Sequence, residues 1–140
     1  MKHSLDRYLY VIGLLKQKQE YVCAADVGRF LGVKASAVSL ALRKLRDQGY
    51  LIKKVNGDLS FSPLFREYAD QINERIVFFR KLLVCFGVES SIADHDAVTL
   101  SRKLSNASCR ALRSAYRLND GKEKEDNIAT AEHVDKPALP

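Results

Sequence analysis

The spacing of apolar residues predicts three helices in the first part of the chain. Residues 4–18, 24–31 and 35–48 each place apolar side chains at three- and four-residue steps, which gathers them on one face of a helix. Gly32 follows the second stretch and Gly49 the third, and glycine suits a helix end because it tolerates left-handed backbone. We therefore expect a helix, a short helix, a tight turn and a third helix.

Two short runs of β-prone residues come next. Residues 50–55 and 58–62 flank the pair Asn56-Gly57, which is typical of a two-residue hairpin turn. The sequence therefore predicts a β-hairpin with a two-residue turn at Asn56 and Gly57.

A long helix is expected after the hairpin. Ser62 can cap it, Pro63 suits its first turn, and the helix should end near Gly87. Its expected apolar stripe repeats at helical spacing and consists of Phe65, Tyr68, Ala69, Ile72, Ile76, Phe79, Leu83 and Phe86.

Two further helices are expected before residue 119. Ser90 or Ser91 can cap the first, and Ser105 can cap the second. Their apolar positions are Ile92, Ala93, Ala97, Leu100, Leu104, Ala111, Leu112, Ala115 and Tyr116. Residues 119–140 contain few large apolar side chains and are predicted to form a mobile tail.

Together these elements predict a mainly α-helical protein. Residues 1–62 have the order of a winged helix-turn-helix DNA-binding domain, with three helices followed by a β-hairpin. Residues 63–118 are expected to form a long linking helix and a helical dimerisation domain.

The positive charge of the chain lies in the predicted winged helix. The whole sequence contains 23 Lys+Arg and 17 Asp+Glu, a net charge of +6. Residues 1–62 hold 11 of the basic and 5 of the acidic side chains, so they account for the whole excess. This segregation favours an anionic partner, and with the motif it predicts double-stranded DNA.

The third predicted helix has the two faces that DNA recognition needs. Val38, Leu42 and Leu45 can hold it to its own domain, while its polar side enters a major groove. Arg43 is the first candidate for base reading because a guanidinium matches guanine O6 and N7, and Leu40 could touch a thymine methyl group. Lysines at the helix entrance and on the hairpin are expected to contact phosphates. The predicted DNA-contacting residues are Lys34, Ser36, Ala37, Ser39, Leu40, Arg43, Lys44, Lys53, Lys54 and Asn56.

Other signals narrow the class of protein. The cysteines, Cys23, Cys85 and Cys109, show no metal-ribbon or disulfide spacing, which fits a reducing cytoplasm. Cys85 is expected to be a buried small hydrophobe, while Cys109 lies near Arg110 and Arg113 and leaves a weak redox-sensing alternative. No apolar run suggests a membrane span or signal peptide, and no catalytic motif or small-molecule substrate is identified, so no enzyme is predicted.

The sequence resembles the diphtheria toxin repressor and manganese transport regulator family of metal-dependent repressors. The similarity spans roughly residues 4–118, and its best segments are 20–22 through 27–33, Ser36-Ala37-Val38 with Leu42 and Leu45, Gly49-Tyr50-Leu51-Ile52 and Phe86-Gly87-Val88-Glu89. The length matches the short, manganese-type members. The resemblance implies a homodimer, built from the helices after the wing, that recognises a palindromic operator.

The chain departs from this family at the metal site. The family binds Mn²⁺ or Fe²⁺ through Asp and Glu in the first helix, a His in the long helix and a Glu-x-x-Glu-His group in the next. An ungapped alignment places Arg7, Tyr10, Ile76, Val98, Ser101 and Arg102 at these positions. Hard divalent ions need carboxylate, imidazole or carbonyl donors, so no metal cofactor is predicted. A shifted alignment would restore Mn or Fe, because Asp6, Asp94, His95 and Asp96 lie near the vacated positions.

The resulting interpretation is a sequence-specific transcriptional regulator, expected to be a repressor, whose DNA binding does not need metal. Two alternatives stay open: a winged-helix module that docks proteins, and an architectural protein that binds DNA without sequence preference. Binding to duplex DNA that is sensitive to salt and discriminates among sequences would distinguish the transcriptional regulator from both alternatives.

Overall fold

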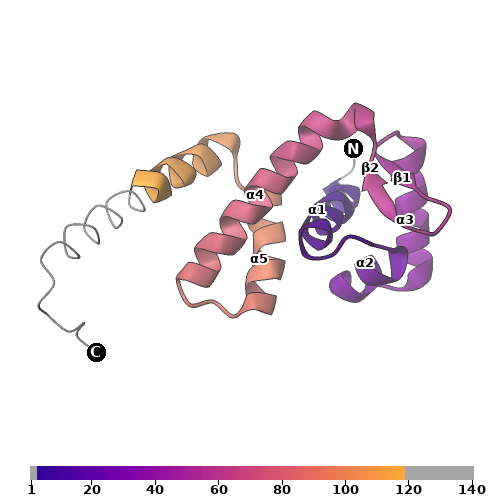
Figure 1. Cartoon of the computed structure of the whole chain (residues 1–140), viewed down its shortest axis with the longest axis horizontal. Helices are drawn as coiled ribbons and strands as arrows, with labels where there is room; N and C mark the ends of the chain where they lie inside the picture. The colour runs from indigo at the N-terminus through magenta and orange to yellow at the C-terminus, as the bar shows by residue number, and fades with distance from the viewer. Residues whose placement is uncertain (1–2, 119–140) are drawn as a thin grey trace, which may run out of the picture. The chain divides into compact units, whose positions relative to one another are not determined.

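The computed structural model describes residues 3–118 and divides the chain into two compact units, one ending at Leu104 and one beginning at Ser105. The first unit is helical with one small β-hairpin (Figure 1). Its elements are α1 (His3–Lys18), α2 (Ala24–Leu31), α3 (Ala35–Asp47), β1 (Leu51–Lys53), β2 (Leu59–Phe61), the 3-10 turn η1 (Pro63–Phe65), α4 (Arg66–Cys85) and α5 (Ser90–Lys103). This order confirms the predicted winged helix-turn-helix followed by a helical region. The boundary at residue 62 stays a prediction.

Helix α1 is the centre of the first unit. It packs against α2 and α3 on one side and α4 and α5 on the other, as Figure 1 shows. The side chains of Leu9, Val11, Ile12 and Leu14 are completely buried. A helix that is apolar around most of its circumference belongs in the core of a fold, and α1 therefore joins the winged helix to α4 and α5.

The hairpin is confirmed, but its turn is longer than predicted. β1 and β2 are antiparallel, with Leu51 opposite Phe61 and Lys53 opposite Leu59. The backbone N–H of Lys54 donates to Asp58 O at 2.8 Å, and that of Gly57 donates to Lys54 O at 2.9 Å. Only Gly57 in this turn has a positive φ, 92°, so Asn56 does not adopt the conformation of a two-residue type I′ turn. The connection is a three-residue loop in which Gly57 takes the left-handed position.

The expected cap of the long helix is present. The Ser62 Oγ accepts a hydrogen bond from the backbone N–H of Leu64, and Pro63 lies in the first turn. The prediction for α5 was wrong by one residue, because its N-cap is Glu89 and not Ser90 or Ser91. The Glu89 carboxylate accepts from the N–H and the hydroxyl of Ser91, and these bonds hold the pKa of Glu89 below its usual value.

The apolar stripes of α4 and α5 are only partly buried. Ala69, Ile72, Ile76 and Phe79 pack inside as expected, while Tyr68, Phe86 and Ile92 are exposed in the single chain. Cys85 is also exposed, which corrects the expectation that it is a buried hydrophobe. All four exceptions are apolar or aromatic side chains for which helical periodicity alone predicted a covered face.

The second unit is described for residues 105–118, of which residues 106–118 are helical. The backbone N–H of Ser108 donates to the Ser105 Oγ at 3.2 Å, so Ser105 caps this helix as predicted. Leu112 and Leu118 are exposed, and Cys109 is buried. The predicted tail, residues 119–140, lies outside the described residues.

Candidate nucleic-acid interface

Helix α3 is held by a tight turn after α2. Gly32 caps α2 with φ 66° and donates its backbone N–H to Gly28 O. At Gly28 the two helices come close, since a Cβ there would lie 3.3 Å from Val38 Cγ2. Gly32 requires glycine because its φ is positive, and Gly28 favours glycine because α3 packs close to it. Together these two positions fix the direction of α3.

The two faces of α3 are sharply divided. Val38, Ala41, Leu42 and Leu45 are buried against the domain, as the sequence predicts. Every predicted DNA-contacting residue is exposed, and these are Lys34, Ser36, Ala37, Ser39, Leu40, Arg43, Lys44, Lys53, Lys54 and Asn56. Leu40 is 49% exposed, in contrast to Leu42 and Leu45 on the inner face of the same helix. The outer face of α3 is therefore free to meet a partner of its own.

The hairpin is anchored to the rest of the domain by two residues that sequence reasoning did not single out. The Tyr21 hydroxyl donates to Asn56 O at 2.8 Å. Asp58 accepts from Lys16 Nζ at 2.7 Å and from the backbone N–H of Val22 at 2.9 Å. These hydrogen bonds lower the pKa of Asp58 to about 2. An acid directly after Asn-Gly was the available signal, but its partners lie far away in sequence.

Two of the predicted wing contacts are partly engaged within the hairpin. The Asn56 Oδ1 accepts from the backbone N–H of Asp58 at 3.0 Å, which leaves the amide nitrogen as its side-chain donor. Lys54 Nζ lies 3.6 Å from Asp58 Oδ2 and remains 62% exposed. Lys53, at the end of β1, is exposed. The lysines are therefore the stronger candidates for phosphate contacts in the hairpin.

Acidic side chains are scarce on this surface. Residues 34–57, which span α3 and the hairpin loop, contain Lys34, Arg43, Lys44, Arg46, Lys53 and Lys54 as basic residues. Asp47, at the end of α3, is the one acidic residue in the same segment. A helix with no acid in its first turn and a strongly basic surround is suited to a polyanion.

The residues at the metal-ligand positions of the resembled family do not form a metal site. Ile76 and Val98 are buried and carry no donor atom. Tyr10 is buried as well, and burial together with the neighbouring Tyr68 raises its pKa, so its phenol stays protonated and neutral. Across residues 3–118 no group of three or more His, Cys, Asp or Glu side chains is placed to hold an ion.

The remaining positions bring cations to the same region. Arg102 donates from Nη2 and Nε to Asp6 Oδ1 at 2.7 and 3.1 Å, and so joins α5 to α1. The Arg7 Nε and the Ser101 Oγ are buried, and neither has a hydrogen-bond partner within the described part of the chain. Mn²⁺ or Fe²⁺ does not fit this set of side chains, because the one carboxylate among them, that of Asp6, is already paired with Arg102.

Asp94 and His95, the other candidate ligands, have different partners. Asp94 is 2% exposed and accepts from Lys18 of α1 and Arg80 of α4 at 2.5 Å each. The His95 ring stacks on Phe30 of α2, with 3.9 Å between the ring centroids. His95 is exposed, and its stacked ring covers part of α2. Both residues tie α5 to the winged helix.

These features define residues 3–61 as a winged helix-turn-helix, with α3 as the helix whose outer face is uncovered. Residues 1–58 match the family model described as the iron dependent repressor, N-terminal DNA binding domain. This segment is therefore a domain of the iron-dependent repressor type, which confirms the resemblance seen in the sequence. Among proteins with curated descriptions, none matches the chain by sequence.

One solved structure supports the fold, and a second is less similar. T. acidophilum IdeR matches with a TM-score of 0.59 and 21% identity, over 81% of this chain and 53% of that one. The chain thus spans about half the length of that protein. A hypothetical protein from Sulfolobus solfataricus matches with a TM-score of 0.45 and 14% identity, over 78% of this chain and 85% of its own.

No helix within residues 3–118 is long and apolar enough to cross a membrane.

Proposed function

We propose that the protein is a sequence-specific DNA-binding transcriptional repressor that acts as a homodimer and binds its operator without a metal ion. The observation that carries this proposal is the outer face of α3, which is exposed, basic and flanked by an anchored hairpin. The family of residues 1–58 supports DNA as the partner.

In this proposal α3 lies in a major groove. Arg43 reads guanine with its forked donors, Ser36 and Ser39 bond to bases or phosphates, and Leu40 contacts a thymine methyl group. Lys34, Lys44, Lys53 and Lys54 bind phosphates, together with the Asn56 amide, and set register and affinity.

The proposed dimer follows from the resemblance and is supported by exposed apolar side chains after the wing. Phe86 is 80% exposed in the first unit, close in sequence to the half-exposed Ile92. The second unit exposes Leu112 and Leu118. We infer that these exposed side chains, taken in each unit by itself, contact a second copy of the chain, and a twofold dimer matches two half-sites of a palindrome.

Metal independence is proposed from the chemistry of the vacated ligand positions. Where a divalent ion would draw carboxylates of α1 and α5 together, Arg102 reaches Asp6 directly. The Arg102 guanidinium on α5 and the Asp6 carboxylate on α1 therefore join the two helices directly, where relatives would use metal ligands from both helices and a dissociable ion. The arrangement of α1 against α5 is then present without an effector. The DNA-binding conformation is already populated, so no ligand is needed to shift the protein toward it.

The test is the binding of chelator-treated protein to a pool-selected duplex, followed by fluorescence anisotropy across salt concentrations. We expect log K to fall with log salt, and Lys34→Ala to reduce the slope by about 1 while weakening all sequences alike. Arg43→Ala should lose about 1–3 kcal/mol of discrimination at particular base pairs. Lys103→Ala, an exposed charge on α5, is the matched control and should change neither quantity by much.

The outcome separates the alternatives. An architectural protein would lose affinity uniformly on Arg43→Ala, because its contacts carry no sequence information. A protein-docking module would show no salt-dependent binding to duplex at all. Either result contradicts the proposal.

A further inference from the structure

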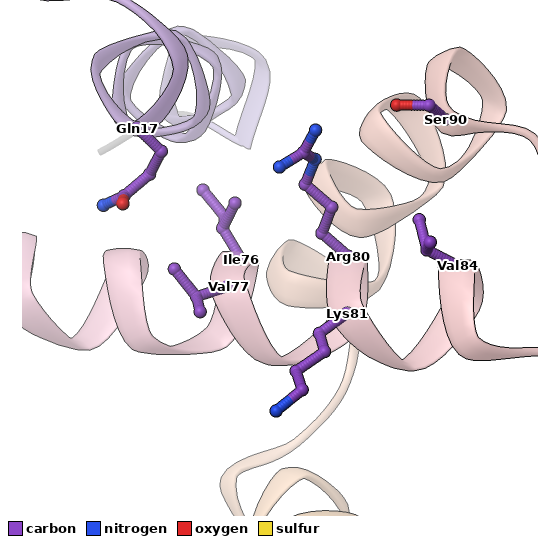
Figure 2. A pocket seen from close by; sticks show the side chains of 7 residues that line it. All are labelled: Gln17, Ile76, Val77, Arg80, Lys81, Val84 and Ser90. Atoms are coloured by element: carbon purple, nitrogen blue, oxygen red, sulfur yellow. The ribbon is translucent and has the colours of Figure 1, made fainter.

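A cavity of about 410 Å³ lies between the end of α1, the middle of α4 and the start of α5 (Figure 2). Its lining residues are Gln17, Ile76, Val77, Arg80, Lys81, Val84 and Ser90. This volume falls in the range of about 300–1,000 Å³ that is usual for small-molecule sites. The cavity uses the same three helices that supply the metal ligands of the resembled family, and Ile76 occupies one of those positions.

The lining combines an aliphatic wall with positive charge. Ile76, Val77 and Val84 come from one side of α4, and both valines are 47% exposed, so they lack the cover that aliphatic side chains gain in a filled site. Figure 2 shows the Arg80 guanidinium directed toward the space between α1 and α5, with Gln17 and Ser90 on either side. None of the lining side chains is acidic.

The charge around Arg80 stays positive after its ion pair is counted. Arg80 donates from Nε to Asp94, and the structure gives its two terminal nitrogens no partner among residues 3–118. Asp94 is shared with Lys18, so the three groups together carry one positive charge. Asp94 itself is 2% exposed and does not line the cavity. A guanidinium fork is the donor best matched to a carboxylate.

We propose that this cavity binds a small aliphatic carboxylate, with its carboxylate on the terminal nitrogens of Arg80 and its hydrocarbon chain along Val77 and Val84. A role as effector rests on the proposed function. If the bound carboxylate changes the affinity for operator DNA by some factor, operator DNA changes the affinity for the carboxylate by the same factor. The binding itself does not depend on DNA.

The experiment is isothermal titration calorimetry of the full chain with sodium hexanoate, without DNA. We expect saturable binding with one site per chain, and much weaker binding of hexan-1-ol, which has the same chain without the charge. Val77→Glu should weaken hexanoate binding about tenfold or more, because it places a like charge beside the carboxylate. Val55→Glu, at a fully exposed residue of the hairpin loop, is the matched control and should bind like the unmodified chain.

Val77 is half-exposed, so both variants are expected to fold, and circular dichroism verifies this. The proposal is overturned if hexan-1-ol binds as tightly as hexanoate, if no saturable heat appears, or if Val77→Glu binds hexanoate like Val55→Glu. Operator binding measured without hexanoate tests the proposed function separately, so either idea can fail while the other holds.

Discussion

The ion pair between Asp6 and Arg102 offers a direct test of how α1 is held to α5. We consider Asp6→Asn and Arg102→Gln, singly and together. The two side chains are 20% and 14% exposed, and two guanidinium nitrogens meet one carboxylate oxygen. Charge centres about 4 Å apart attract by about 4 kcal/mol at an effective dielectric constant of about 20. Desolvation and lost side-chain freedom oppose this attraction, so we expect a coupling energy of about 1–3 kcal/mol.

Urea unfolding of the four proteins measures this coupling energy as the non-additive part of the double-mutant cycle. The pair Asp26 and Arg29 is a suitable control, because it joins neighbouring turns of α2 and its arginine is 75% exposed. Its cycle should give about 0.5 kcal/mol or less. A coupling energy for Asp6 and Arg102 no larger than that of the control would show that this ion pair does not hold α1 to α5.

Operator affinity measured on the same proteins links the pair to function. If the pair holds the binding-competent arrangement, the single variants bind operator more weakly, by up to the factor that corresponds to the lost coupling energy. Addition of Mn²⁺ should not restore the affinity, since the region provides no ligand set for it. Recovery with Mn²⁺ would show that a metal site exists after all.

Four other changes test separate parts of the structure. Leu45→Ala removes a completely buried side chain from α3 and should cost about 2–5 kcal/mol in urea unfolding, and a loss below about 1 kcal/mol would contradict the described core. Folding lowers the pKa of Asp58 from 3.8 to about 2, so its contribution to the free energy of unfolding is complete above about pH 5 and fades as the pH falls through 3.8 toward 2. Asp58→Asn should make stability depend less on pH in this acidic range. An unchanged dependence would argue against the contact with Lys16. Asp94→Asn should destabilise the chain by about 1–3 kcal/mol in thermal unfolding, since Lys18 and Arg80 lose their shared charge but can still reach water; no loss would mean that the ion pairs contribute little. Gly57→Ala places a Cβ 3.1 Å from the Tyr21 hydroxyl at φ 92° and should cost about 1–2 kcal/mol and weaken operator binding, while an unaffected variant would question the loop geometry.

Local signals predicted the elements well because they depend on neighbouring residues. Gly32 ends α2, Ser62 caps the turn before α4, and the spacing from Val38 to Leu45 orients α3. The turn at Asn56-Gly57 shows the limit of such signals. The dipeptide fits more than one loop length, and the backbone bond from Lys54 to Asp58 selects the longer one.

Partners that are distant in sequence could not be predicted from local signals. Asp58 is paired with Lys16 and Asp94 with Lys18, across separations that the packing of α1 closes, while Arg80 reaches Asp94 through the packing of α4 on α5. Burial was also misjudged where periodicity indicated a covered face, as at Phe86 and Cys85. Both positions are exposed in the single chain, so periodicity signals an apolar stripe without saying what covers it.

Whether α3 reads DNA without a metal ion is decided by selection of bound duplexes from a random pool by the full chain, with a chelator present and with added Mn²⁺ or Fe²⁺. We expect enrichment of one palindromic sequence under every condition, and a loss of preference at defined base pairs on Arg43→Ala. Enrichment that requires added metal would contradict metal independence. Absence of any enriched sequence would contradict the assignment of α3 to a DNA groove.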